Sequence, residues 1–381
     1  MDTTEVFDEL ARWARERGVE LNGVAPRSLP DRGIGIVATK PRKVNDLILH
    51  VPASALRTLD TVRAKVKKSL PKGTKVHAIL AADLALDKPT SKYAPWNAVL
   101  PSRESVSTHL PLAWTDRALH RYLPKPALAL LNKQQSKFTR DWAAIQQSPL
   151  ATSIPKQEDF LYFWLLANTR TFYHESAQNA GLPKDDRMVL QPVADLFNHA
   201  DTGCEVAFTP DGFTITADRE YAKGDEVYIC YGKHSNDFLL VEYGFVLAEN
   251  RWDEVCLDDA ILPELSRQQK AVLEERGFLG NYVLDQRTVC YRTQVALRLL
   301  CVPAGRWERL VYEGEDGGEA VQQKVDRLFV KILRKYHGKV EETIQELEEL
   351  EDCQSWQREV LCLRWQQIRG LVNQTIERLE A

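Results

Sequence analysis

The pattern of apolar and polar positions first predicts a helix over residues 4–18, which Gly18 would end. Its apolar residues recur three or four positions apart among charged ones: Phe7, Leu10, Trp13 and Ala14. Two short segments rich in β-branched residues follow, residues 34–40 and 46–52, and each is bounded by Gly or Pro. This pattern predicts two strands that pair with each other. The stretch before them, residues 25–33 (APRSLPDRG), predicts a turn-rich loop.

Residues 56–150 differ in character and predict a helical insertion between strands. Apolar positions at helical spacing mark two helices within it, over residues 77–88 and 124–145. A basic stretch over residues 63–75 precedes both helices. A run of like charges is commonly a solvated face, so this stretch predicts no specific partner.

The middle of the chain changes between helical and extended patterns. Residues 158–174 (EDFLYFWLLANTRTFYH) are apolar and aromatic, which predicts a buried helix. Residues 204–221 predict a hairpin with Asp211 and Gly212 at its turn. Residues 226–232 (EVYICYG) predict a further short strand.

From about residue 250 the pattern is helical to the end. One helix is marked by Val340, Ile344, Leu347 and Leu350, and a longer one by Trp356, Val360, Leu363, Ile368, Leu371 and Ile376. Two such helices can pack as an antiparallel pair. The chain is therefore predicted to be α+β, with a strand-rich part over residues 1–250 and a helical part over residues 251–381.

Charge and cysteine content exclude several classes of protein. A formal net charge of −4 does not favour nucleic acid as a partner, because duplex binders usually carry a basic excess. Seven cysteines without a CxxC pair predict neither a disulfide framework nor a metal site. The acidic N-terminal residues predict no signal peptide, and the apolar run over residues 160–166 is too short to span a membrane. We expect a cytoplasmic or nuclear location, or both.

Three segments carry the candidate chemistry. In residues 32–36 (RGIGI) the two glycines would let a ligand approach the backbone, although a lone GxG is commonly a turn and the full GxGxxG is absent. Residues 195–199 (DLFNH) could bind a ligand, or form a loop in which Asn198 satisfies its own backbone. The third candidate consists of residues 226–232 and residues 243–245 (YGF), both of which contain tyrosine. A single tyrosine in a strand is commonly a packing residue.

In this order and spacing, the segments RGIGIV, DLFNHA, GDEVYICYG and VEYGF resemble the SET-domain methyltransferases. They are similar to the Rubisco large-subunit methyltransferase subgroup, and the similarity extends to YAPWN (93–97), NTRTF (168–172) and VEETI (340–344). The resemblance implies a β-rich SET domain with a pseudo-knot over residues 1–250, carrying the helical insertion at about 56–150. An all-α substrate-binding domain over residues 251–381 would follow.

The resemblance also implies roles for the matching residues. Those that would bind the cofactor, S-adenosyl-L-methionine, are Arg32, Gly33, Ile34, Asp195, Asn198, His199 and Tyr231. Those that would bind the target lysine are Arg170, Phe172 and Tyr243. Tyr231 and Tyr243 would be catalytic by positioning the reactants. The family often has an acid where Arg32 stands, so a contact through the backbone is expected there.

The implied activity is methylation of a lysine on another protein, which is the expected partner. A non-histone target is favoured because no zinc-binding, cysteine-rich segment follows the SET core. A ribosomal protein, a translation factor or a metabolic enzyme would fit. Two alternatives stay open. Relatives of the same fold methylate histidine, but they lack the channel tyrosine that Tyr243 supplies here. A SET-like domain could also bind peptide without catalysis.

Overall fold

The computed structural model describes residues 3–30, 32–176, 179–209, 212–287, 289–313, 318–351 and 353–381. The chain forms two compact units, residues 1–115 with 131–233 and residues 116–130 with 234–381. The predicted domain boundary near residue 250 stays a prediction. Within the described residues, no helix combines the length and apolar character that crossing a bilayer requires.

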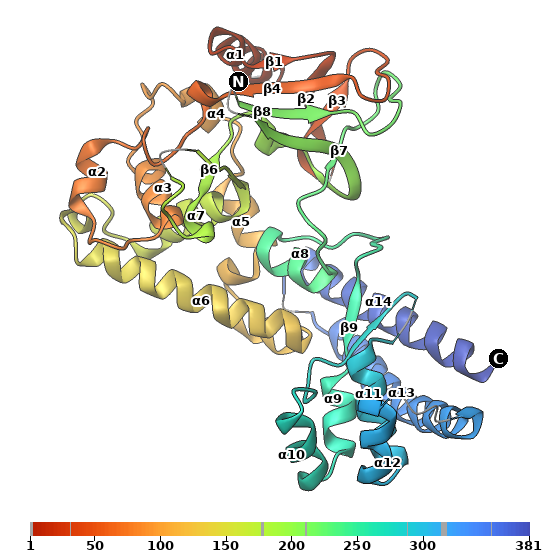
Figure 1. Cartoon of the computed structure of the whole chain (residues 1–381). Coiled ribbons are helices and arrows are strands. Elements are labelled where there is room, and N and C mark those ends of the chain that lie inside the picture. The colour runs from red at the N-terminus through yellow and green to blue at the C-terminus, as the bar shows by residue number, and fades with distance from the viewer. Residues whose placement is uncertain are drawn as a thin grey trace. The chain divides into compact units, whose positions relative to one another are not determined.

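The first unit contains a four-stranded antiparallel sheet with the order β1-β4-β8-β7 (Figure 1). Its strands are β1 (Glu20–Leu21), β4 (Leu47–Pro52), β7 (His199–Thr209) and β8 (Gly212–Thr216). Strands β7 and β8 form the predicted hairpin, in which Phe208 lies opposite Phe213. Asp211 of the predicted turn lies outside the described residues. Phe213 and Ile215 are fully buried, so one face of this sheet supplies core.

Strand β3 (Gly33–Ala38) pairs with β2 (Val24–Leu29) and not with β4, so the predicted pairing of residues 34–40 with 46–52 is wrong. Strand β2 also forms where the sequence predicts a turn-rich loop. It runs antiparallel to β3, with Pro26 opposite Ile36. Strand β2 pairs with β3 alone and is an edge strand, which admits proline because one side of the strand needs no ladder donor.

The helices predicted over residues 4–18 and 158–174 are both present in the structure. Helix α1 (Thr3–Glu16) ends before Gly18, whose φ of +76° stops the helix. Helix α7 (Gln157–Arg170) is buried as predicted but is shorter, because residues 171–173 leave it as strand β5 (Thr171–Tyr173), which pairs with β6 (Met188–Leu190). The β-branched and aromatic side chains of that segment favour an extended backbone.

The insertion is helical, and its core is the contact of α3 (Val76–Ala85) with α7. Both helices are apolar on most sides, which suits helices packed within a core. Helix α6 (Lys125–Gln146) matches the second predicted helix. The remaining helices of this region are α2 (Ala64–Ser69), α4 (Ala94–Asn97) and α5 (Arg103–His109), with 3₁₀ turns at Ala53–Ala55, Pro111–Ala113, Arg117–Tyr122, Pro149–Thr152, Lys184–Asp186 and Ala194–Leu196.

Residues 226–232 were predicted to form a strand, but they form an extended segment with isolated bridges only. The Val227 amide donates to the Ile36 carbonyl over 2.8 Å. Two residues later the Ile229 amide donates to the Asn198 carbonyl over 3.0 Å. The Cys204 amide donates to the Tyr228 carbonyl over 2.8 Å. Because the segment changes partners within three residues, it crosses from β3 to β7 and cannot form a regular ladder with either.

The second unit is helical, as predicted, and its long helices α13 (Gly318–Glu348) and α14 (Ser355–Glu380) lie side by side (Figure 1). They are antiparallel, because Arg334 pairs with Glu380 while Arg369 pairs with Glu341. The other helices are α8 (Asn236–Tyr243), α9 (Asp258–Ile261), α10 (Arg267–Glu275), α11 (Tyr291–Cys301) and α12 (Ala304–Glu308), with a 3₁₀ turn at Leu262–Glu264 and a π turn at Arg309–Glu313. A small sheet of β9 (Glu254–Cys256) and β10 (Val283–Asp285), not predicted from the sequence, joins them.

We predict that Gly203→Ala destabilises the crossing of residues 198–204 with 226–231. A Cβ at position 203 would lie 2.7 Å from the Tyr228 carbonyl oxygen and 2.9 Å from the Ile229 Cα, both of which are backbone atoms that cannot rotate away. The expected loss of unfolding free energy is about 1–3 kcal/mol, measured by urea denaturation. Gly181→Ala is the matched control, because its Cβ meets nothing within 4 Å. Equal urea denaturation midpoints for Gly203→Ala and Gly181→Ala would show that the close contact at Gly203 does not limit stability.

We also predict that His77 makes stability depend on pH. Its Nε2 lies 3.1 Å from Thr171 Oγ1, and burial, helped by the charge of Lys137, lowers the pKa of His77 to about 4. The pKa of His77 in the unfolded chain is about 6.5, so the free energy of unfolding is unaffected by His77 above that pH. As pH falls from 6.5 toward 4, only the unfolded chain binds the proton, and the free energy of unfolding decreases. Between pH 7.5 and 5 the wild type should lose about 2 kcal/mol more than His77→Gln in urea denaturation. Equal losses of unfolding free energy in the wild type and in His77→Gln would exclude His77 as the cause of the pH dependence.

Candidate functional site

Two predicted motifs of the first unit meet where Tyr231 contacts His199. The Tyr231 amide donates to His199 Nδ1 over 3.0 Å, and the two rings lie 4.9 Å apart at 31°. The Tyr231 hydroxyl donates to the Phe197 carbonyl over 2.6 Å. Because Nδ1 accepts a hydrogen bond, the neutral imidazole carries its proton on Nε2. The predicted association of residues 195–199 with Tyr231 is therefore present, while the threading implied by a pseudo-knot stays a prediction.

The remaining predicted motif of this unit, residues 32–36, contacts the junction through the Glu226 side chain. Arg32 Nη1 lies 2.8 Å from Glu226 Oε2 and 2.7 Å from the Tyr228 hydroxyl. Asn198 Nδ2 donates to the other carboxylate oxygen, Oε1, over 2.8 Å. The sequence predicts Arg32 and Asn198 as site residues but not Glu226, although this acid lies inside the GDEVYICYG segment. Arg32 thus directs its side chain to a protein carboxylate.

The two glycines of this motif differ in what surrounds them. Gly33 has a φ of +71°, and a Cβ there would meet nothing within 4 Å, so it lies at an open edge of the strand. At Gly35 a Cβ would lie 2.8 Å from Glu226 Oε1 and 2.9 Å from Asn198 Nδ2. Gly35 therefore leaves room for a side-chain pair, whereas Gly33 fits the predicted close approach of a ligand. Ile34, between them, is half-buried opposite Ser28.

Asp195 has a fully buried carboxyl group that contacts two other side chains. Trp96 Nε1 lies 3.1 Å from each of its carboxylate oxygens. Arg170 Nη1 donates to the Asp195 carbonyl over 2.8 Å and to Oδ2 over 3.2 Å. Burial raises the pKa of the Asp195 carboxyl, against the lowering effect of Arg170. This geometry favours a supporting role for the Asp195 side chain, and the sequence gives no sign of Trp96 as its partner.

Arg170 and Phe172 lie at the junction of α7 and β5. Arg170 Nε is buried and has no hydrogen-bond partner among the described residues, so it is a donor available to a ligand. The Phe172 ring lies 5.3 Å from that of Phe213 at 67°, an edge-to-face contact with the sheet core. The predicted lysine-binding roles of both residues stay predictions.

In the second unit, Tyr243 ends helix α8 within an aromatic cluster that consists of His234, Phe238, Tyr243 and Phe245. The Tyr243 ring lies 6.4 Å from Phe238, 6.4 Å from Phe245 and 6.5 Å from His234. Gly244 follows with a φ of +82° and caps the helix. Burial, with the nearby charge of Glu242, raises the pKa of Tyr243 to about 12. The sequence predicts Tyr243 alone, although the four aromatics fall within twelve residues of one another.

A buried ion-pair network anchors the other end of α8. Arg364 of α14 is fully buried, and its Nε and Nη1 each lie 2.7 Å from a carboxylate oxygen, of Asp237 and Asp253 respectively. Asp253 also accepts the Asn236 amide over 2.9 Å. Asn236 and Asp237 form the first turn of α8. Helix α14 therefore fixes the helix that carries Tyr243, through charges that would be costly to leave unpaired.

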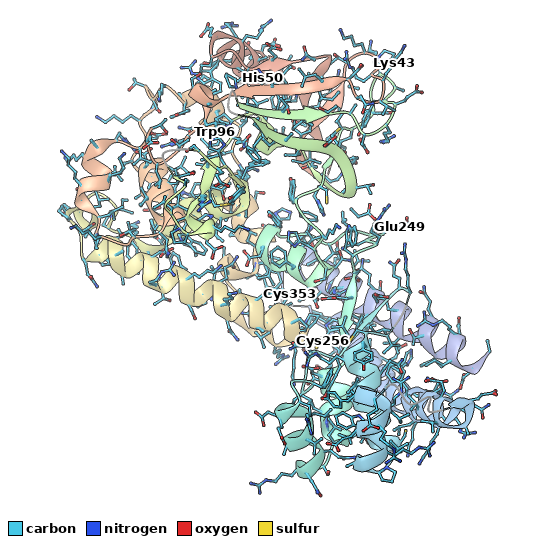
Figure 2. All side chains as sticks on the ribbon, in the orientation of Figure 1. Lys43, His50, Trp96, Glu249, Cys256 and Cys353 are labelled. Atoms are coloured by element: carbon cyan, nitrogen blue, oxygen red, sulfur yellow. The ribbon has the colours of Figure 1, made fainter. Side chains whose placement is uncertain are left out.

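The described residues contain no group of three or more His, Cys, Asp or Glu side chains placed to hold a metal ion. The seven cysteines are free thiols, and Cys256 and Cys353 of the second unit are labelled in Figure 2.

"SET domain-containing protein 4" of Mus musculus is 28% identical, with 91% of this chain and 84% of the relative covered. "Ribosomal lysine N-methyltransferase set11" of Schizosaccharomyces pombe is 24% identical, covering 96% of this chain and 98% of the relative. "Actin-histidine N-methyltransferase" of Danio rerio is 25% identical over 66% of this chain and 44% of the relative.

A solved structure of Rubisco LSMT bound to AdoMet matches 98% of this chain and 93% of its own, with a TM-score of 0.63 and 19% identity, which shows a common fold. The family model described as "Ribosomal lysine N-methyltransferase 2 C-terminal domain" matches residues 253–378. The model described as "SET domain" matches residues 33–232, over half of the chain. The chain therefore belongs to the SET-domain family.

Proposed function

We propose that this chain is an S-adenosylmethionine-dependent protein-lysine N-methyltransferase whose substrate is a ribosomal protein. The SET-domain match, the relative that spans nearly the whole chain and the C-terminal family match support a lysine methyltransferase. The observation that carries the proposal is the junction of Asn198, His199 and Tyr231, because it joins the predicted cofactor motifs through direct hydrogen bonds.

The residues at this junction fit a sulfonium amino acid. Such a ligand has an ammonium group that needs acceptors and a carboxylate that needs donors. Asn198 offers an amide oxygen, and Gly33 lies at an open strand edge. Arg170, which the resemblance assigns to the target lysine, has a buried Nε–H that could serve the cofactor carboxylate instead. S-adenosyl-L-methionine, when bound, supplies an electrophilic methyl group. Because unpaired buried polar groups are costly, a ligand that pairs the Arg170 donor gains affinity.

Tyr243 acts as a neutral hydroxyl in this proposal. Its pKa of about 12 keeps it protonated at neutral pH, so it cannot serve as a general base there. It can hold an incoming amine by hydrogen bonding. That amine must be neutral to be a nucleophile, and deprotonating lysine, with its pKa of about 10.4, costs roughly 4–5 kcal/mol at pH 7. An apolar aromatic environment disfavours the ammonium form and supplies part of this cost.

A ribosomal protein is favoured over a translation factor or a metabolic enzyme by the C-terminal family match and the Schizosaccharomyces pombe relative. The last turns of α13 are also acidic, with Glu342, Glu346 and Glu348 exposed. An acidic surface attracts basic partners at long range. The predicted cytoplasmic or nuclear location is compatible with such a substrate and stays a prediction.

Histidine methylation is the second candidate, because actin-histidine N-methyltransferases are among the relatives. Against it stands the family expectation that such enzymes lack the channel tyrosine that Tyr243 matches. Binding of peptide without catalysis is disfavoured by the retained junction of Asn198, His199 and Tyr231.

The experiment that tests the proposal is incubation of the purified chain with isolated ribosomal proteins and S-adenosylmethionine carrying a labelled methyl group. Tandem mass spectrometry of the labelled peptides should locate the label on lysine. Label on histidine would favour the second candidate. Cofactor binding without label on any ribosomal, translation-factor or enzyme fraction would favour the non-catalytic alternative.

We predict that Tyr243→Phe lowers the methylation rate about tenfold, because one hydrogen bond to the amine, worth about 1.5 kcal/mol, is lost. The dissociation constant for S-adenosylhomocysteine should stay within about twofold, because Tyr243 is assigned to the lysine and not to the cofactor. Tyr312→Phe is the matched control, since Tyr312 belongs to the same unit and is 51% exposed. An unchanged rate in Tyr243→Phe would remove Tyr243 from the lysine site.

A further inference from the structure

The Glu226 carboxylate contacts two side chains of the first unit that are distant in sequence, Arg32 and Asn198, and one of its own segment, Tyr228. Its Oε1 accepts from Asn198 Nδ2 over 2.8 Å. Its Oε2 accepts from the Tyr228 hydroxyl over 2.7 Å and forms an ion pair with Arg32, whose Nη1 lies 2.8 Å away. The Glu226 side chain is 8% exposed, whereas that of Arg32 is 55% exposed. Glu226 is therefore an almost buried anion whose partners are two of the predicted cofactor residues and one tyrosine.

An ionised carboxylate can only accept hydrogen bonds. The Asn198 carboxamide must therefore turn its NH₂ group toward Glu226, since the opposite orientation would oppose two acceptor oxygens. This requirement fixes an orientation that is otherwise a choice between two similar shapes. The amide oxygen then points away from Glu226. Asn198 is half-buried, so that oxygen is presented by a side chain that is held in place.

Arg32 and Gly35 complete the arrangement. Arg32 neutralises the Glu226 charge from the exposed side, so the carboxylate is not left as a free anion. Gly35 lies under the pair, where any Cβ would come within 2.8 Å of Glu226 Oε1 and 2.9 Å of Asn198 Nδ2. Gly35 therefore packs closely against the Glu226 and Asn198 side chains where they meet.

We propose that Glu226 is a positioning residue for the cofactor site, which acts by orienting the Asn198 carboxamide so that its oxygen faces the ligand. The ligand group received there must be a hydrogen-bond donor, which an ammonium or an exocyclic amine supplies. This inference rests on the proposed function, because it assumes that Asn198 contacts S-adenosylmethionine. Glu226 itself contacts no ligand in this account.

The test is calorimetric titration of S-adenosylhomocysteine into the full chain and into the variants Glu226→Ala, Asn198→Ala and the double variant. We expect each single variant to weaken binding about tenfold. The double variant should bind no more weakly than Asn198→Ala alone, because Glu226 acts through Asn198. Additive losses in the double variant would overturn the proposal, as would unchanged binding in Glu226→Ala.

Two further variants separate orientation from charge and from folding. Glu226→Gln keeps an oxygen that can accept from Asn198, so it should restore binding to within about threefold of the wild type. Tyr228→Phe removes a different donor from the same carboxylate and should change binding less than about twofold. A loss in Glu226→Gln equal to that in Glu226→Ala would show that charge, and not orientation, matters. If Glu226→Ala fails to fold, Glu226→Gln and Tyr228→Phe still decide the matter, because a loss in either one overturns the proposal.

The wild-type titration distinguishes this inference from the proposed function. If the wild type does not bind S-adenosylhomocysteine, the proposed function fails and the inference falls with it. If the wild type binds and the losses from Glu226→Ala and Asn198→Ala add, only the role of Glu226 is wrong.

Discussion

The first unit depends on the backbone crossing of residues 198–204 with residues 226–231. Amide-to-carbonyl bonds of 2.8 to 3.0 Å join the two segments at Cys204 and Ile229. A buried backbone group without a partner is costly, so this crossing fixes both segments in relation to each other. It brings Asn198, His199 and Tyr231 together although more than thirty residues separate the first from the last. A site built this way is positioned by the main chain before any side chain contributes.

The candidate functional residues are further held by side chains from elsewhere in their own unit. Trp96 of the insertion and Arg170 at the end of α7 both contact the buried Asp195 carboxylate, next to the crossing. In the second unit, Arg364 pairs with Asp237 and with Asp253 at the start of the helix that ends in Tyr243. Such buried charges tolerate only one arrangement, because each loses its partner if a segment shifts. This is a physical reason for rigid positioning of groups that act by geometry rather than by proton transfer.

Much of the fold could be predicted from the sequence where the signal is local. Helix α7, helix α6 and the hairpin of β7 with β8 each follow from periodicity or turn residues within one segment. The partner of strand β3 could not, because β2 contains Pro26 and resembles a loop when it is considered alone. Strand β9 is only three residues long, which is too short for a periodic pattern.

The candidate site shows the same division. Asn198, His199 and Tyr231 could be predicted because the order of their motifs resembles a known family. Glu226 and Trp96 could not, because a carboxylate that accepts from Asn198 and an indole that donates to Asp195 are defined only by contacts distant in sequence. The aromatic neighbours of Tyr243 could have been found by the density of rings in residues 234–245.

The most direct test of the central claim, that the crossing segments form the cofactor site, is amide hydrogen exchange of the full chain with and without S-adenosylhomocysteine. The account predicts slower exchange in residues 32–36, 195–204 and 226–231, because the ligand would lie against all three segments and suppress their local opening. Protection confined to other segments, with exchange in these three unchanged by a bound ligand, would contradict it.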